Sequence, residues 1–233
     1  KLKHAGVHEL RGKKLWHLTF AGSMRTGCEL TSDKGTATES EINAVSMPQP
    51  PRWQETNLDL LGLKGGASNS SSQDGLVAND EGEVVAYWAS FLTQVVKEGR
   101  LQNVNYFAGI TTDTIEDIVT ALRSGDPPTV MYAFGAEMEK LGLSAVRGML
   151  MDAAMTEEAE AKCEHWPPKV MAVKRRWAGT MAHEVLRDSD IVLEINGRRI
   201  ETYRDIDLAV SGNKRVTALV VRGGARLTVD IDT

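Results

Sequence analysis

Short runs of alternating apolar and polar residues, separated by turn-forming residues, dominate the first ninety positions of the chain. Alternation with a period of two predicts β-strands with one buried face. A proline-rich bend at residues 47–51 and a Gly/Ser/Asn-rich stretch at residues 65–72 interrupt these runs and favour loops. This part of the chain is therefore expected to be all-β, with strands at residues 14–21, 41–45, 57–61, 75–78 and 84–91.

After residue 111 the apolar positions change to helical spacing. The run at residues 114–122 predicts an amphipathic helix, which Asp113 can cap and which Gly125-Asp126-Pro127-Pro128 ends. Beyond this linker, residues 129–134 favour a strand and residues 143–151 a short helix. The charged stretch at residues 156–162 leaves a helix and a mobile insertion as open alternatives.

The last block carries the clearest local signals. Its strongest turn signal is Asn196-Gly197, and Asp190 is placed to cap or brace the turn before a buried strand. A hairpin is predicted to turn on Arg222-Gly223-Gly224. The elements expected here are strands at residues 169–174, 191–195, 216–221 and 225–231 and helices at residues 180–186 and 203–210.

These patterns predict a mainly β fold with short helices. A chain of 233 residues suits two units of ordinary size. We expect a β unit over residues 1–110, a helix and linker over residues 111–128, and a second domain over residues 129–233 with an insertion around residues 152–168.

Composition narrows the classes of function. The net charge of −5 gives no global basic field, so neither nucleic acid nor an anionic membrane surface is an expected partner. Cys28 and Cys163 stand in no metal-binding context and form no disulfide framework, and no phosphate-cradling glycine motif occurs. We therefore expect no metal and no other cofactor.

No apolar run approaches the roughly 18 residues that a membrane span needs, so none is expected. The chain starts without an initiator methionine and without the apolar core of a secretory signal. A processed form or a part of a longer chain is expected, not a secreted protein. Two kinds of location stay open: an organelle, either a plastid or a mitochondrion, and the nucleus.

The order of motifs in the last block resembles a known domain. Ala178-Gly179 precedes a short helix, residues 188–197 run from an Asp-rich turn through a strand into Asn196-Gly197, and the helix at residues 203–210 follows. This order resembles the PDZ domains of HtrA/Deg-type serine proteases, apart from Ser189, where the family usually has glycine.

The resemblance implies a domain that binds extended peptides or protein C-termini by adding them as a strand to a sheet edge. It implies an edge strand and a carboxylate loop near residues 128–134 and a groove helix at residues 203–210. An ordinary core role is an equal alternative for each of the candidate peptide-binding residues. These candidates are Val130, Tyr132, Phe134, Ile206 and Val210.

The first half is similar to the second, degenerate trypsin-like unit of the large plant and fungal Deg proteases. The similarity is carried by residues 51–58, 74–77 and 82–88 and extends over about residues 51–210. Active members of the wider family carry Gly-Asn-Ser-Gly-Gly before the strand that follows the nucleophile, because the glycines let backbone N–H groups form an oxyanion hole.

Here the same stretch is Ser70-Ser71-Ser72-Gln73-Asp74. Ser72 can stand only as a degenerate nucleophile position, since an acidic residue beside an oxyanion hole opposes the negative charge that develops there. The upstream histidines, His4, His8 and His17, lack the small-residue setting of a catalytic base, and only Asp33 or Asp59 could complete a triad. We expect no Ser-His-Asp triad in this chain.

Three functions remain. The first is a non-catalytic peptide-binding and scaffolding unit in protein–protein interaction or complex assembly. The alternative is the regulatory and substrate-selecting portion of an active Deg-type serine endopeptidase whose catalytic unit lies upstream. The third is a structural subunit of a larger organellar or protease assembly, with its peptide groove filled by a neighbour or by the chain itself.

Overall fold

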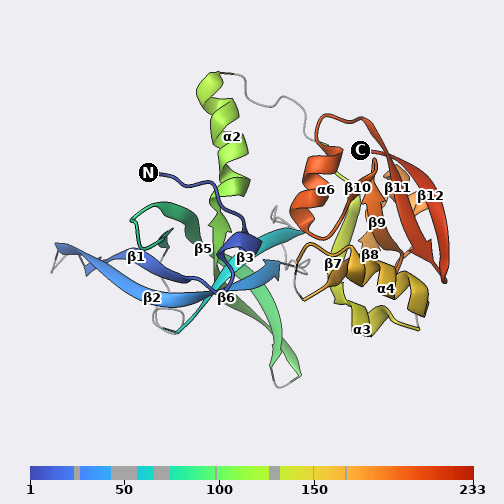
Figure 1. Ribbon diagram of the computed structural model, residues 1–233. Coiled ribbons are helices and arrows are strands. Elements are labelled where there is room, and N and C mark those ends of the chain that lie inside the picture. Colours follow the sequence, from blue (N-terminus) through green and yellow to red (C-terminus); the bar gives the residue numbers. More distant parts are fainter. Residues whose placement is uncertain are drawn as a thin grey trace. The chain divides into compact units, whose positions relative to one another are not determined.

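The computed structural model describes residues 1–23, 27–42, 57–65, 74–97, 99–125, 132–148, 150–165 and 167–233 (Figure 1). The chain divides into two compact units. The barrel unit comprises Lys1–Glu55 and Asp59–Pro128, and the C-terminal unit comprises Thr56–Leu58 and Thr129–Thr233. Both units are built mainly from strands with short helices, so the predicted fold class is confirmed.

The barrel unit is a closed sheet of six strands in the order β1-β2-β3-β6-β5-β4, with β1 paired to both β2 and β4. All pairings described between these strands are antiparallel. The strands are β1 (Lys14–Ser23), β2 (Gly27–Ile42), β3 (Leu58–Lys64), β4 (Gly75–Ala78), β5 (Val84–Lys97) and β6 (Arg100–Thr111).

The strands predicted at residues 14–21, 75–78 and 84–91 are confirmed, although β1 and β5 run further, to Ser23 and Lys97. The strand predicted at residues 57–61 is β3, which starts one residue later and ends at Lys64. The strand predicted at residues 41–45 was too short, because its described residues are only the end of β2; residues 43–45 lie outside the described part. Most of β2 was missed because polar residues fill it, and the ladder with β1 makes this segment a strand.

The inside of the barrel is filled by alternate residues of its strands. Along β1, Leu15, His17 and Thr19 are buried, while the residues between them are at least partly exposed. Burying one aliphatic side chain contributes roughly 1.5–3 kcal/mol, so this alternation holds the register of β1. The buried cluster is completed by Leu61, Leu63, Val77, Val85, Ala86 and Trp88, with Ala5, Leu10 and Ala37.

His17 makes the stability of the barrel unit depend on pH. Its side chain is 1% exposed, and its ring centroid lies 5.2 Å from that of Trp88. Burial lowers the pKa of His17 below its usual 6.5, and Asp33, the opposite residue on β2, acts in the other direction. The folded barrel therefore binds fewer protons at this site than the unfolded chain does.

We expect the contribution of His17 to be fully present above pH 6.5 and to be lost as the pH falls from there through the lowered pKa. Urea unfolding at about pH 7.5 and about pH 5.5 measures this change in the free energy of unfolding. The His17→Phe variant, which keeps an aromatic ring against Trp88, should lose less stability on acidification than the wild type. An equal loss in both proteins would contradict the assignment.

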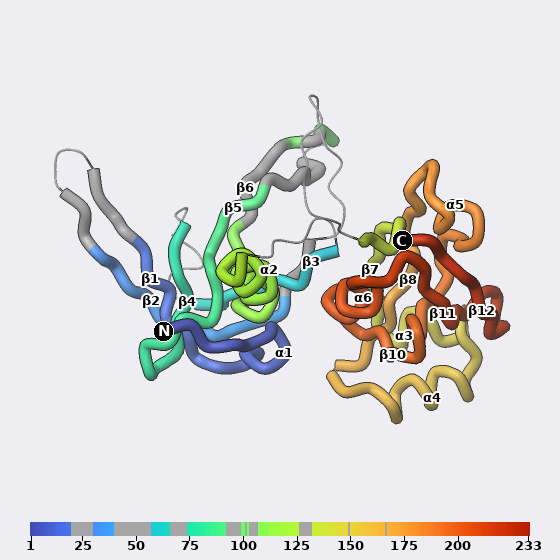
Figure 2. The backbone as a smooth tube through the Cα atoms, turned by 90° about the horizontal axis from the view of Figure 1, so that it is seen from above, coloured from blue at the N-terminus to red at the C-terminus, as the bar shows by residue number. Residues whose placement is uncertain are grey.

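The barrel unit contains two helices, one before its first strand and one after its last. α1 (Val7–Leu10) buries Val7 and Leu10, and α2 (Thr112–Ser124) follows β6 directly. Figure 2 shows α2 close to β5 and β6. The helix predicted at residues 114–122 is confirmed; its cap residue is Thr111, and Asp113 accepts a hydrogen bond from the Thr114 N–H at 2.8 Å. Gly125 ends it in the left-handed conformation.

The C-terminal unit contains an antiparallel sheet in the order β12-β11-β9-β8-β7, with β10 paired to β9. Its strands are β7 (Ala136–Gly142), β8 (Lys169–Arg176), β9 (Ile191–Ile195), β10 (Arg198–Arg199), β11 (Arg215–Arg222) and β12 (Ala225–Asp232). Its helices are α3 (Leu143–Val146), α4 (Ala153–Ala161), α5 (Met181–Val185) and α6 (Tyr203–Val210).

Both faces of this sheet are covered. Along β8, Met171 and Val173 join a cluster with residues of α5 and α6, while Val170 and Ala172 join a second cluster with residues of α3 and α4. Strands buried on both faces are expected to read as nearly continuous apolar runs, as β8 and β9 do at Val170–Val173 and Ile191–Ile195.

Two predictions in this unit were wrong. The strand predicted at residues 129–134 is absent from its described residues 132–134, and the strand begins at Ala136. Gly135, at φ +75°, breaks the extended backbone where it presses against Thr180 and Ala182. The helix predicted at residues 143–151 ends at Val146, because Gly148 turns the chain at φ +75°.

The open choice at residues 156–162 is decided in favour of a helix. α4 covers most of this stretch and starts three residues earlier, after Asp152, whose side chain accepts from the Met155 N–H at 2.7 Å. No helix in the described residues is long and apolar enough to cross a membrane.

Candidate peptide-binding site

The edge strand of the C-terminal sheet, β7, lies beside the start of helix α6. Within the described sheet β7 pairs only with β8. Tyr203, the first residue of α6, is 1% exposed, and its hydroxyl donates to the carbonyl of Met138 at 3.4 Å. The Lys140 ammonium lies 5.3 Å from the centroid of the Tyr203 ring. A sheet edge beside a helix is the arrangement that accepts an extended peptide as an added strand.

The start of α6 is determined by hydrogen bonds between residues close together in the sequence. The Thr202 hydroxyl accepts from the Asp205 N–H at 3.0 Å, and the Asp205 carboxylate accepts from the Thr202 N–H at 3.0 Å. This reciprocal pair is a capping box, which sets the first residue of the helix. The helix then buries Tyr203, Ile206, Ala209 and Val210 and leaves Leu208 exposed.

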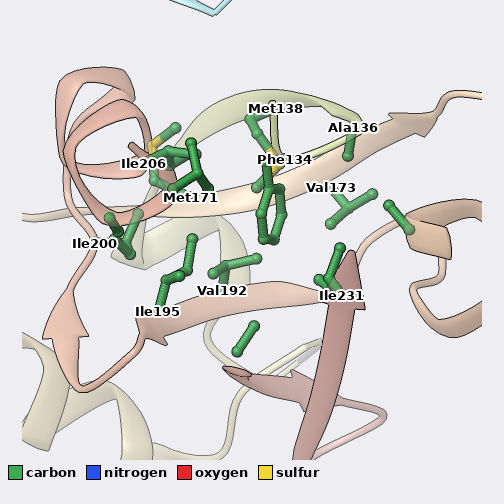
Figure 3. Packing of buried hydrophobic residues seen from close by; sticks show 14 of the residues in the cluster. Phe134, Ala136, Met138, Met171, Val173, Val192, Ile195, Ile200, Ile206 and Ile231 are labelled. Atoms are coloured by element: carbon green, nitrogen blue, oxygen red, sulfur yellow. The ribbon is translucent and has the colours of Figure 1, made fainter. Parts of the chain in front are cut away.

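Three of the predicted peptide-binding residues lie in the core. Phe134, Ile206 and Val210 are 4%, 4% and 1% exposed and share one cluster with Met138 and Met171. Figure 3 shows the Phe134 ring directed into this cluster. Tyr132 is partly exposed, and Val130 lies outside the described residues. A peptide-binding role for these five residues stays a prediction.

The turn before β7 is held by the segment after β8. The Gly135 carbonyl accepts from the Trp177 N–H at 3.0 Å and from the Thr180 hydroxyl at 3.4 Å. A Cβ atom at Gly135 would lie 3.0 Å from the Ala182 Cβ. Only glycine fits this turn without strain, since the backbone is also in the left-handed region.

Sequence reasoning missed a buried carboxylate on β7. The Glu137 side chain is 5% exposed, and it lies 3.5 Å from the Lys174 ammonium and 3.6 Å from the Arg175 guanidinium. In the sequence, the basic cluster Lys174-Arg175-Arg176 lies at the end of the strand predicted at residues 169–174. Its position opposite Glu137 is visible only once β7 and β8 are paired.

Asp190 braces the turn before β9, as its position predicted. Its side chain is 1% exposed and accepts from the Arg187 N–H at 2.8 Å. Arg222 of β11 donates to both carboxylate oxygens, at 2.8 and 2.6 Å, and this raises the pKa of the Arg222 guanidinium. Ser189 occupies the left-handed region at φ 73°, which explains why glycine is the usual residue at this position of the motif.

The chain after α4 is tied to the start of α6. The Glu201 side chain is 6% exposed, is ion-paired with Arg199, and accepts from the Glu164 and His165 N–H groups at 3.1 and 3.3 Å. The Cys163 thiol lies 3.3 Å from the same carboxylate, and burial raises the pKa of this thiol.

Ser72, the candidate nucleophile position, lies outside the described residues. Asp74 and Gly75 after it are described, and the Thr19 hydroxyl donates to the Asp74 carbonyl at 3.1 Å. Among the upstream histidines, His17 is buried inside the barrel, and His4 is exposed and bonded to Glu116 at 2.8 Å. The expectation that no triad is present stays a prediction.

Among the described residues, no group of His, Cys, Asp and Glu side chains is arranged to hold a metal ion. No protein-family model matches the chain.

Several curated proteins are similar in sequence. The chain is 26% identical over 201 residues to the pro-apoptotic serine protease NMA111 of Chaetomium globosum, covering 84% of this chain and 19% of that protein. It is 28% identical over 170 residues to NMA111 of Kluyveromyces lactis, covering 71% of this chain and 16% of that protein. NMA111 of Eremothecium gossypii is 25% identical over 235 residues, with 96% and 22% covered. The chain thus spans about a fifth of the length of these relatives.

Solved structures with a similar course of the chain include the HtrA-type protease AlgW with a tripeptide, at a TM-score of 0.49 and 11% identity, covering 99% of this chain and 68% of that one. The same protease with a decapeptide matches at a TM-score of 0.45 and 12% identity, with 99% and 63% covered. These sequence relatives confirm the resemblance of the chain to the HtrA/Deg-type serine proteases that the motifs indicated.

Proposed function

We propose that the C-terminal unit is a PDZ-type module that binds extended peptides or protein C-termini. The observation that carries this proposal is the position of α6 beside the edge strand β7, which the Tyr203 hydroxyl, 3.4 Å from the Met138 carbonyl, marks. An edge strand offers backbone N–H and C=O groups, and a helix beside it offers side chains that select a sequence. The order of motifs from Ala178 to Val210 supports the same assignment.

We further propose that the whole chain is a non-catalytic scaffolding portion of a larger HtrA/Deg-like protein of the plant and fungal branch. A barrel unit derived from a protease would then carry the peptide-binding unit in an assembly. Gln73 and Asp74, where active members have glycines, support the loss of catalysis. One observation favours the alternative of a regulatory and substrate-selecting portion, namely that the chain spans about a fifth of relatives named as serine proteases.

The test is binding of a fluorescein-labelled library of decapeptides with free C-termini to the purified chain. Hydrogen exchange would map the site with an internal control. Amides of β7, Ala136–Gly142, are expected to gain protection on peptide addition, and amides of β12, Ala225–Asp232, at the opposite end of the sheet, are not.

A fluorogenic casein digest with wild type and Ser72→Ala runs beside the binding assay. Selective binding without cleavage supports the proposal. Cleavage that Ser72→Ala abolishes would show an active protease unit in this chain. If the chain showed neither binding nor cleavage, the assignment would change to a structural subunit.

A further inference from the structure

One residue far along the sequence already bonds to the edge of β7. Asn57 lies in the short segment Thr56–Leu58, which clusters with the C-terminal unit. Its side-chain Nδ2 donates to the Ala136 carbonyl at 2.9 Å, and its Oδ1 accepts from the Met138 N–H at 2.7 Å. Both bonds are within the range of good hydrogen bonds between amides.

The two bonds reproduce the pairing of a parallel strand. In a parallel ladder, one residue of the added strand donates to the carbonyl before the facing residue and accepts from the N–H after it. The Asn57 amide does this around Glu137, with the carbonyl of Ala136 and the N–H of Met138. A side-chain amide carries the same donor and acceptor as a peptide group, so Asn57 takes the place of one residue of a bound peptide.

A second side chain covers the next group along the same edge. The Met138 carbonyl accepts from the Tyr203 hydroxyl at 3.4 Å. The carbonyl of Ala136 and both backbone groups of Met138 are therefore already bonded to side chains. A strand added over this part of β7 would have to displace these bonds, because each backbone group in a ladder needs its partner.

We propose that Asn57 is an internal competitor for the peptide site, so that this chain binds an extended peptide at β7 only when Asn57 leaves the edge. This inference rests on the proposed peptide-binding function and adds its regulation. The measured affinity is then the affinity of the open edge multiplied by the fraction of molecules in which Asn57 is released.

The backbone at Asn57 supplies a clean way to test this. Asn57 has φ 64°, a left-handed conformation that glycine adopts without strain and alanine does not. Asn57→Gly therefore removes the side-chain amide and keeps the local backbone. Asn196 offers a matched control in the same unit, since it has φ 51° and its side chain accepts from the Thr217 N–H of β11 at 2.9 Å.

Asn57→Gly is expected to bind the best decapeptide of the library about tenfold more tightly than wild type, since two neutral hydrogen bonds no longer hold the edge closed. Without peptide, the Met138 amide should exchange with solvent roughly tenfold faster in this variant, because its hydrogen-bond acceptor is gone. Asn196→Gly should leave the affinity and the Met138 exchange rate at wild-type values.

The outcomes separate this inference from the proposed function. Equal affinities of wild type and Asn57→Gly would overturn the competition and leave peptide binding intact. An unchanged exchange rate of the Met138 amide would overturn the contact itself. If neither protein bound any decapeptide of the library, the proposed function would fall, and the competition with it.

Discussion

Replacing Arg222 by methionine is expected to destabilise the C-terminal unit by about 3 kcal/mol or more. The change leaves the Asp190 carboxylate, 1% exposed, without the guanidinium that contacts both of its oxygens. Removing one partner of a buried ion pair is costly, because the remaining charge is held away from water with no opposite charge beside it. The Val185 carbonyl also loses its bond from Arg222 at 2.8 Å.

Urea unfolding with hydrogen exchange measured separately for the two units would give the change in the free energy of unfolding. Arg226→Met is the matched control in the same hairpin, since Arg226 is 41% exposed and its ion pair with Glu158 lies at the surface. That variant should be nearly as stable as the wild type. Equal losses in the two variants would contradict the assignment of a buried ion pair between Arg222 and Asp190.

The elements that the sequence predicted best are those with local signals. β9 and α6 have the predicted bounds, because Asn196-Gly197 sets the turn after β9 and the Thr202–Asp205 pair sets the start of α6. The brace by Asp190 was predictable for the same reason, since Arg187 lies three residues away. Its partner Arg222 was not, because that contact spans 32 positions of the chain.

The candidate site shows the limit of such reasoning. The family resemblance made Ile206 and Val210 of α6 candidate peptide-binding residues, and the structure buries both side chains in the core. The start of β7 depends on Gly135 meeting Thr180 and Ala182, a contact that no local pattern records. Asn57 reaches β7 across 79 positions, so its role at the edge is visible only after folding.

The barrel shows a third case, in which pairing makes a strand from a segment without an apolar pattern. β2 contains polar residues along most of its length, yet β1 pairs with it from Lys14↔Thr36 to Ser23↔Gly27. Register in such a ladder comes from the inward residues of its partner, Leu15 and His17 among them. A sequence window over β2 alone contains none of this information.

The second large effect concerns the start of β4. We expect Gly75→Ala to destabilise the barrel unit by about 3 kcal/mol or more. A Cβ atom at Gly75 would lie 2.3 Å from the Leu18 carbonyl oxygen and 2.9 Å from the His17 Nε2. The first of these atoms is backbone in the β1 ladder, so it can move only if β1 and β4 separate.

Gly109→Ala is the control for this prediction, because the glycine lies in the same barrel but has different neighbours. Its added Cβ would meet the Ala86 and Leu61 Cβ atoms at 3.2 Å, and a shift of a few tenths of an ångström relieves both contacts. About 1 kcal/mol is expected there. Urea unfolding and the exchange of β1 and β4 amides would measure both variants, and a Gly109→Ala loss as large as that of Gly75→Ala would contradict the argument.

The same contacts explain why glycine follows Ser72-Gln73-Asp74. Glycine at position 75 is required by the close approach of β1 and β4, whether or not the preceding serine reacts. A glycine in this place is therefore no sign of a retained nucleophile. If Gly75→Ala unfolds the barrel unit while Ser72→Ala leaves its stability unchanged, the two positions serve packing and chemistry separately, and the casein digest alone decides whether the chemistry remains.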